Sequence, residues 1–134
     1  MDDDRAQIAE IVRTFFAAFT SGPDLGSRLD GLQDVFLPEA LVVRTCGVPM
    51  SYDVDSFIEP RRELLTSGRV TDFREWELDG STRTFGDVAH HWCTYAKEWV
   101  EDGEQVTGAG AKSIQLVRTE TGWRISSLAW DDER

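Results

Sequence analysis

The chain contains 134 residues, which is one domain's length and too short for two independent hydrophobic cores, so we expect a single domain over residues 1–134. Its 14 Lys and Arg against 25 Asp and Glu give a formal net charge of −11, which would repel nucleic acid. Hydrophobic residues at 40% and charged residues at 29% exclude disordered and fibrous proteins. Five Trp and seven Phe indicate an aromatic core or the walls of a cavity.

Several features argue against export, membranes and cofactors. The acidic start Met1-Asp2-Asp3-Asp4-Arg5 lacks the basic and apolar regions of a secretory signal, and apolar runs such as residues 41–43 are too short to span a bilayer. Cys46 and Cys93 have no CxxC spacing and no partners at zinc-finger distances, so we expect reduced, buried thiols and no metal. Without a Gly-rich phosphate loop or nucleotide fingerprint, we expect a cytoplasmic protein that uses no cofactor.

The N-terminal half has the apolar spacing of helices. Residues 8–19 predict a first helix, with acidic residues 2–4 as its cap and Gly22-Pro23 as its stop. A second helix is expected over residues 29–36 and a strand over residues 40–44. A third helix should run from Asp53 or Asp55 to Leu65, with Gly68 as its stop and Pro60 as a kink or a late start.

The C-terminal half alternates with period 2 from Thr71 onward, which is typical of strands. Turn signals at Asp79-Gly80, Asp102-Gly103 and residues 120–122 divide it into four strands joined by hairpins. Helices followed by an antiparallel meander predict an α+β domain.

Hairpin geometry predicts which residues share a face of this sheet. Two-residue turns at the first two signals pair Trp76 with Arg83, Cys93 with Lys112 and His91 with Ile114, and a three-residue third loop pairs Ile114 with Leu128 and Lys112 with Trp130. The inner face then holds Trp76, Leu78, Phe85, Ala89, His91, Cys93, Tyr95, Lys112, Ile114, Leu116, Leu128 and Trp130. A bulge, for example at Gly86, Gly108 or Gly110, would exchange the faces beyond it and could turn His90 inward.

The outer face is only half polar, because it carries Val88, Trp92, Val117 and Ile125. An apolar patch of this size is usually covered. We therefore expect a homodimer through this face, with Trp92 and Gln115 between the protomers.

The chain resembles the nuclear transport factor 2-like superfamily, and within it the bacterial SnoaL-like proteins. The resemblance covers Ile8 to Glu133 and rests on the Phe-rich first helix and on these strings: Phe73 to Glu77 (FREWE), Phe85 to His90 (FGDVAH), Lys112 to Val117 (KSIQLV), Gly122 to Ile125 (GWRI) and Trp130 to Glu133 (WDDE). It implies a cone-shaped, cystatin-like α+β fold, commonly dimeric, in which three N-terminal helices pack on a strongly curved antiparallel sheet around a cavity. It implies no single function, since members include isomerases, cyclases, dehydratases, epoxide hydrolases and transport factors.

The ketosteroid isomerase mechanism of this superfamily does not carry over. It needs a carboxylate base on the strand after the second helix and a Tyr with a protonated Asp for the oxyanion. Residues 42–46 offer no carboxylate, the position for that Asp falls near Ile114, and the first helix has Phe rather than Tyr. An Asp-Arg-Asp arrangement of the epoxide hydrolase type has no clear place on the inner face either.

His91 and Lys112 are the candidate catalytic residues of an acid–base site, as general base and as electrostatic stabiliser of an enolate-like intermediate. The alternative is that His91 is a satisfied core histidine and that Lys112 reaches the mouth of the cone. His90 is expected in the dimer interface unless a bulge turns it inward. The candidate ligand-binding residues are Trp76, Phe85, Tyr95, Ile114, Leu128 and Trp130.

Two further groups have both a functional and a plain interpretation. Four arginines near the end of the third helix could bind an anion or could simply form a solvated helical face: Arg61, Arg62, Arg69 and Arg74. The rim of the cavity is predicted to include Arg44, Tyr52 and Asp53. The sequence therefore predicts a domain that binds a small hydrophobic organic molecule, with cofactor-free acid–base chemistry of isomerase, cyclase or dehydratase type. The alternatives are a dimeric structural or interaction module with a filled core and a transport-type adaptor.

Overall fold

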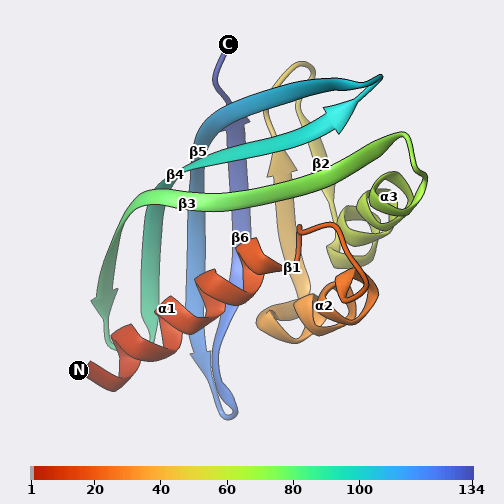
Figure 1. The fold of residues 1–134 in the computed structure, drawn as a ribbon. Helices are drawn as coiled ribbons and strands as arrows, with labels where there is room; N and C mark the ends of the chain where they lie inside the picture. Colours follow the sequence, from red (N-terminus) through yellow and green to blue (C-terminus); the bar gives the residue numbers. More distant parts are fainter. Residues whose placement is uncertain (1) are drawn as a thin grey trace.

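The computed structural model describes residues 2–134 and shows three helices packed against one face of a strongly bent sheet (Figure 1). In chain order the elements are α1 (Asp2–Ala17), α2 (Leu25–Leu32), a short 3₁₀ helix (Gln33–Val35), β1 (Phe36–Arg44), β2 (Met50–Tyr52), α3 (Val54–Thr66), β3 (Val70–Phe85), β4 (Val88–Glu101), β5 (Glu104–Thr119) and β6 (Gly122–Asp132). The α+β class and the helices on a curved sheet are confirmed.

The sheet is mixed rather than purely antiparallel, with six strands in the order β2-β1-β6-β5-β4-β3. β1 lies parallel to β6, whereas every other neighbouring pair is antiparallel. Local turn signals could not show this, because β1 and β6 are separated along the chain by α3 and four strands, and a parallel pair needs such a long crossover. The short strand β2 was also not predicted.

The ends of the helices follow their sequence signals with some corrections. α3 begins after Asp53, whose carboxylate accepts a 2.8 Å hydrogen bond from the Ser56 amide, and it continues through Pro60. Gly68, with φ of +84°, follows its end as expected. α2 lies earlier than residues 29–36, because β1 already starts at Phe36. β1 contains Pro38, where its pairing with β6 is irregular between Phe36 and Leu41. Residues 2–4, predicted as the cap of α1, lie in its first turn instead.

The predicted turn at Asp79-Gly80 is wrong. β3 runs on to Phe85, and the chain reverses at Gly86-Asp87, where Gly86 has the positive φ of 56°. Trp76 therefore pairs with Ala96 instead of Arg83, and a register shift at Leu78 changes which side chains face inward. Leu78 and Phe85 are 60% and 87% exposed, which overturns their assignment to the inner face.

The register of β4, β5 and β6 is confirmed. Asp102 and Gly103 have φ of 54° and 77°, as a tight hairpin requires, and Cys93 pairs with Lys112 as predicted. Lys112 also pairs with Trp130, although the third turn is one residue shorter than expected; a bulge between Ile125 and Ser127 restores the register. That bulge turns Ile125 into the core, where it is fully buried, so its assignment to the outer face is wrong.

The apolar core lies between the helices and the concave face of the sheet, and α1 contributes several Phe side chains to it. Phe15 is fully buried and touches Phe16, Phe19, Phe36 and Phe57 with ring centroids 5.3–6.4 Å apart. Among residues 2–134, no helix is both long enough and apolar enough to cross a membrane.

Candidate functional site

The cavity with the more aromatic lining, which we call the main cavity, opens where α3 and α1 meet the concave face of the sheet, and its volume is about 400 Å³. This is within the usual size of a small-molecule pocket. Its apolar walls are Phe15, Phe19, Phe57, Pro60, Leu64, Leu65, Val70, Phe73, Trp99 and Trp130. Its polar groups are Arg44, Tyr52, Arg61, Arg69, Glu75, Tyr95, Lys97, Glu101, Lys112 and Asp132. The interior is therefore not filled at this end of the fold.

A buried ion pair lies in this cavity. Lys112 Nζ is 3.2 Å from Glu75 Oε1, and the two side chains are only 6% and 10% exposed. The ammonium also lies 4.1 Å from the ring centroid of Tyr95 and 5.1 Å from that of Trp130, which offsets part of its lost hydration. The contact is an ion pair rather than an aligned hydrogen bond, because among the described residues no donor meets hydrogen-bond geometry at Glu75 Oε1. The expected position of Lys112 on the inner face is confirmed, but the ammonium is paired inside the fold.

A second polar cluster lies beside this pair. Tyr95 donates a short hydrogen bond from its hydroxyl to Asp132 Oδ1, and Lys97 Nζ lies 3.1 Å from the same oxygen. Burial, together with the Asp132 carboxylate, raises the pKa of Tyr95 far above its usual value, so the hydroxyl stays a hydrogen-bond donor. Burial also acts to raise the pKa of Asp132, but the hydrogen bond from Tyr95 and the charge of Lys97 outweigh it and lower that pKa.

Arg61 forms a cationic wall of the cavity on α3. Its guanidinium lies 4.2 Å from the ring centroid of Phe57 and 5.2 Å from that of Trp130, and it donates a hydrogen bond to the Phe57 carbonyl. Burial lowers the pKa of Arg61. The predicted arginine cluster is thus divided: Arg61 and Arg69 line the cavity, whereas the other two form ion pairs elsewhere.

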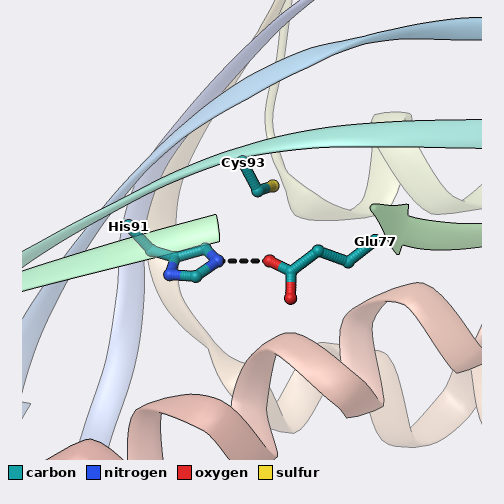
Figure 2. Close-up of side chains that lie close together, drawn as sticks. All are labelled: Glu77, His91 and Cys93. Carbon is teal, nitrogen blue, oxygen red and sulfur yellow. Dashed lines mark hydrogen bonds and ion pairs between the residues drawn. The ribbon is translucent and has the colours of Figure 1, made fainter. Parts of the chain in front are cut away.

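A second pocket, of about 430 Å³, lies between α1 and strands β3 and β4. His91 lines it, with Nε2 2.5 Å from Glu77 Oε2 and Nδ1 2.7 Å from Thr82 Oγ1. Figure 2 shows His91 and Glu77 pointing toward each other, with the Cys93 thiol beside them and α1 running below. Burial, followed by the negative charge of Glu77, raises the pKa of the Cys93 thiol to about 12.

The structure therefore separates the two predicted catalytic residues. Lys112 lies in the main cavity and His91 in the second pocket. His91 does face inward, because its inner-face register is right. His90 lies on the other face, where its Nε2 is 3.0 Å from Ser113 Oγ, so no bulge turns it inward.

The predicted ligand-binding residues are divided as well. Tyr95 and Trp130 line the main cavity, whereas Ile114 and Leu128 are buried in the core beyond it. Trp76 borders the second pocket, but its assignment to the inner face is wrong, because it alternates with the inward-facing Glu75 and Glu77 and pairs with Ala96. Phe85 lies at the exposed end of β3 and belongs to neither pocket, because the true hairpin turn follows it directly. The rim prediction is confirmed for Arg44 and Tyr52, whereas Asp53 instead caps α3.

Sequence reasoning missed Glu75 and Glu77. Neither residue was among the predicted inner-face residues, because Trp76 and Leu78, which alternate with them, were assigned there. The register shift at Leu78 places them beside inner-face residues of β4, with Gly80 opposite Cys93 and Thr82 opposite His91. No composition signal marks this bulge, which places Glu75 and Glu77 on the same face as Gly80 and Thr82.

Comparison with known proteins identifies the fold. No protein-family profile matches the chain, and no characterised protein matches it in sequence. An aromatic ring hydroxylase, so named provisionally, from Novosphingobium aromaticivorans superposes with a TM-score of 0.78 at 21% identity, covering 98% of this chain and 90% of that one. A nuclear transport factor 2-like protein with a cystatin-like fold from the same organism superposes with a TM-score of 0.73 at 17% identity, covering 96% of this chain and 81% of that one.

A provisionally named dehydratase of the nuclear transport factor 2-like family from Streptomyces avermitilis gives a TM-score of 0.73 at 16% identity and covers 98% of this chain and 97% of that one. At these identities the likeness establishes the fold. The chain has the nuclear transport factor 2-like, cystatin-like fold that the sequence resemblance implied.

Proposed function

We propose that the main cavity binds a small, mainly hydrophobic organic molecule that carries a carbonyl or hydroxyl oxygen. We further propose that Glu75 and Lys112 perform acid–base chemistry of isomerase, cyclase or dehydratase type on it. The observation that carries this proposal is the buried Lys112–Glu75 pair inside an aromatic cavity of about 400 Å³. A structural neighbour that is provisionally named a dehydratase supports the same class of chemistry.

The proposed step is a proton transfer next to a carbonyl group. Glu75 takes the proton from the carbon beside the carbonyl, the electron pair of that C–H bond forms the enolate, and Lys112 stabilises the charge that develops on oxygen. Glu75 then returns the proton to the same carbon or to another carbon of the conjugated system. Side chains supply both the base and the stabilising charge, so the step needs no cofactor. Glu75 takes the role first assigned to His91.

Deuterium exchange into 2-tetralone in D₂O, followed by proton NMR, tests the proposal. We expect the protein to accelerate exchange at the carbons beside the carbonyl. Glu75→Gln should lower the rate at least about 100-fold, the usual contribution of a general base. Glu77→Gln is the matched control, because Glu77 lines only the second pocket, whereas Glu75 lines both. Exchange that is absent in the parent, or equal in the two variants, contradicts the proposal.

We also propose that the outer face of the sheet pairs with a second copy of the chain. Val88 and Trp92 are 56% and 51% exposed, and Gln115 is exposed beside them, which supports a covered apolar face. Light scattering should give a dimer for the parent and a monomer for Trp92→Glu. A parent that is monomeric at every concentration contradicts this assembly. The buried and half-buried free thiols Cys93 and Cys46 are compatible with the cytoplasmic location proposed from the sequence.

A further inference from the structure

Three metal-ligating side chains meet outside the main cavity. A carboxylate oxygen of Glu77, a ring nitrogen of His91 and the sulfur of Cys93 all lie within 4.8 Å of one another (Figure 2). Cys93 is fully buried and His91 is 7% exposed, while the Glu77 side chain is 33% exposed toward the second pocket. The proposed acid–base chemistry of the main cavity uses none of the three.

The local backbone builds this cluster. His91 and Cys93 are two residues apart on β4, so their side chains leave the same face of the strand. The register shift in β3 brings Glu77 onto that face as well. Gly80, opposite Cys93, leaves the space between the ligands open: a Cβ there would lie 2.8 Å from His91 Nε2 and closer still to Glu77 Oε2.

Thr82 prepares His91 to act as a ligand. Its hydroxyl oxygen lies 2.7 Å from Nδ1, and with a proton on Nδ1 the ring donates to Thr82 and turns the Nε2 lone pair toward Glu77. Ligating histidines commonly have such a partner on the other ring nitrogen. Nε2 and Glu77 Oε2 are 2.5 Å apart, which is a hydrogen-bond distance. Two ligands of tetrahedral zinc lie about 3.4 Å apart, so the Glu77 carboxylate would move about 0.9 Å away from Nε2 when the ion binds.

We propose that Glu77, His91 and Cys93 bind one divalent transition-metal ion, with Zn²⁺ preferred, and that its fourth position opens into the second pocket. Thiolate, imidazole and carboxylate are together the ligand types of zinc, whereas magnesium and calcium take oxygen ligands. The thiol proton and the proton of the His91–Glu77 hydrogen bond leave to solvent when the ion binds. A thiolate, a carboxylate and a neutral imidazole then balance the two charges of the ion, so the buried site carries no net charge.

Cobalt binding gives a readout that does not depend on activity. The protein, freed of metal by chelation, is titrated with Co²⁺ alone and followed by absorbance. We expect one equivalent to produce a thiolate-to-cobalt charge-transfer band and the visible bands of tetrahedral Co²⁺, and we expect Zn²⁺ to displace it. Cys93→Ser should remove the charge-transfer band, and Cys46→Ser, the matched control, should keep it.

A second variant tests the site without touching a ligand. Thr82→Val should fold normally, because Thr82 is only half-buried, and should weaken Co²⁺ binding about 10–100-fold through the orientation of His91. The proposal is overturned if the parent shows no charge-transfer band. It is equally overturned if the band depends on Cys46 rather than Cys93, or if His91→Ala binds Co²⁺ as tightly as the parent does.

Discussion

The Lys112–Glu75 pair allows a stability prediction worked from its geometry. Lys112→Met leaves the Glu75 carboxylate buried beside a methyl group, and breaking a buried ion pair in this way costs about 3–5 kcal/mol. Lys112 and Glu75 form a buried ion pair of this kind, because their side chains are only 6% and 10% exposed and their charged atoms are 3.2 Å apart. At about 4 °C per kcal/mol for a domain of this size, the melting temperature should fall by about 12–20 °C.

Removing the carboxylate instead of the ammonium should lower the free energy of unfolding by less. Glu75→Met leaves the ammonium of Lys112 unpaired, but the ring of Tyr95 still lies 4.1 Å away and contributes about 1–2 kcal/mol to its stabilisation. The double variant Glu75→Met/Lys112→Met removes both charges and places apolar side chains in the same space. Its stability should lie within about 2 kcal/mol of the parent, because a buried pair replaced by well-packed apolar groups is often close to neutral.

Urea unfolding of the four proteins, followed by circular dichroism, measures the free energies of this double-mutant cycle. The account requires a coupling energy of at least about 2 kcal/mol between the two positions. Single-variant costs that simply add in the double variant would show that the two charges do not stabilise each other, and would refute the reasoning.

Two further predictions concern groups that support the fold and the cavity. The hydrogen bonds from Arg118 lower the pKa of Asp4 from 3.8 to about 2, so Asp4→Asn should destabilise the protein at neutral pH. In urea unfolding, the difference in free energy of unfolding between the parent and this variant should shrink as the pH falls from 4 to about 2. Asp87→Asn removes an exposed partner of the same arginine and should cost less; equal costs would contradict the role of Asp4. Gly110→Ala places a Cβ 2.7 Å from Tyr95 Cζ, so it should cost about 1–3 kcal/mol in the same assay, and parent-like stability would show that Gly110 is not needed there.

The strands that could be aligned from the sequence are those joined by unambiguous local turns. Asp102-Gly103 has the residue types that a tight turn with two positive φ angles demands, so the pairing of Cys93 with Lys112 could be predicted. The predicted pairing of Lys112 with Trp130 was also right, but for an accidental reason. The predicted loop was one residue too long, and the bulge between Ile125 and Ser127 compensated for that error. The error appeared only at Ile125, the residue beyond the bulge.

The side chains of β3 that face inward were predicted wrongly, because Asp79-Gly80 has the composition of a turn but lies within a strand. Gly80 serves packing instead, since a side chain there would collide with the Glu77–His91 pair. A bulge changes the face of a strand without a distinctive composition, so the two inward-facing carboxylates of β3 could not be recognised. The separation of His91 from Lys112 depends on where α1 lies between two pockets, which no local pattern reports.

The most direct test of the main-cavity proposal is the binding of 4-nitrophenol, an aromatic ring whose oxygen changes colour when it ionises. If Lys112 stabilises negative charge inside the cavity, the bound probe should ionise at a lower pH than the free probe. Lys112→Met should abolish this shift, whereas Lys97→Met, which removes the chain's other lysine from the rim of the same cavity, should keep most of it. A probe that binds without any shift, or a shift that survives Lys112→Met, would contradict the proposed site.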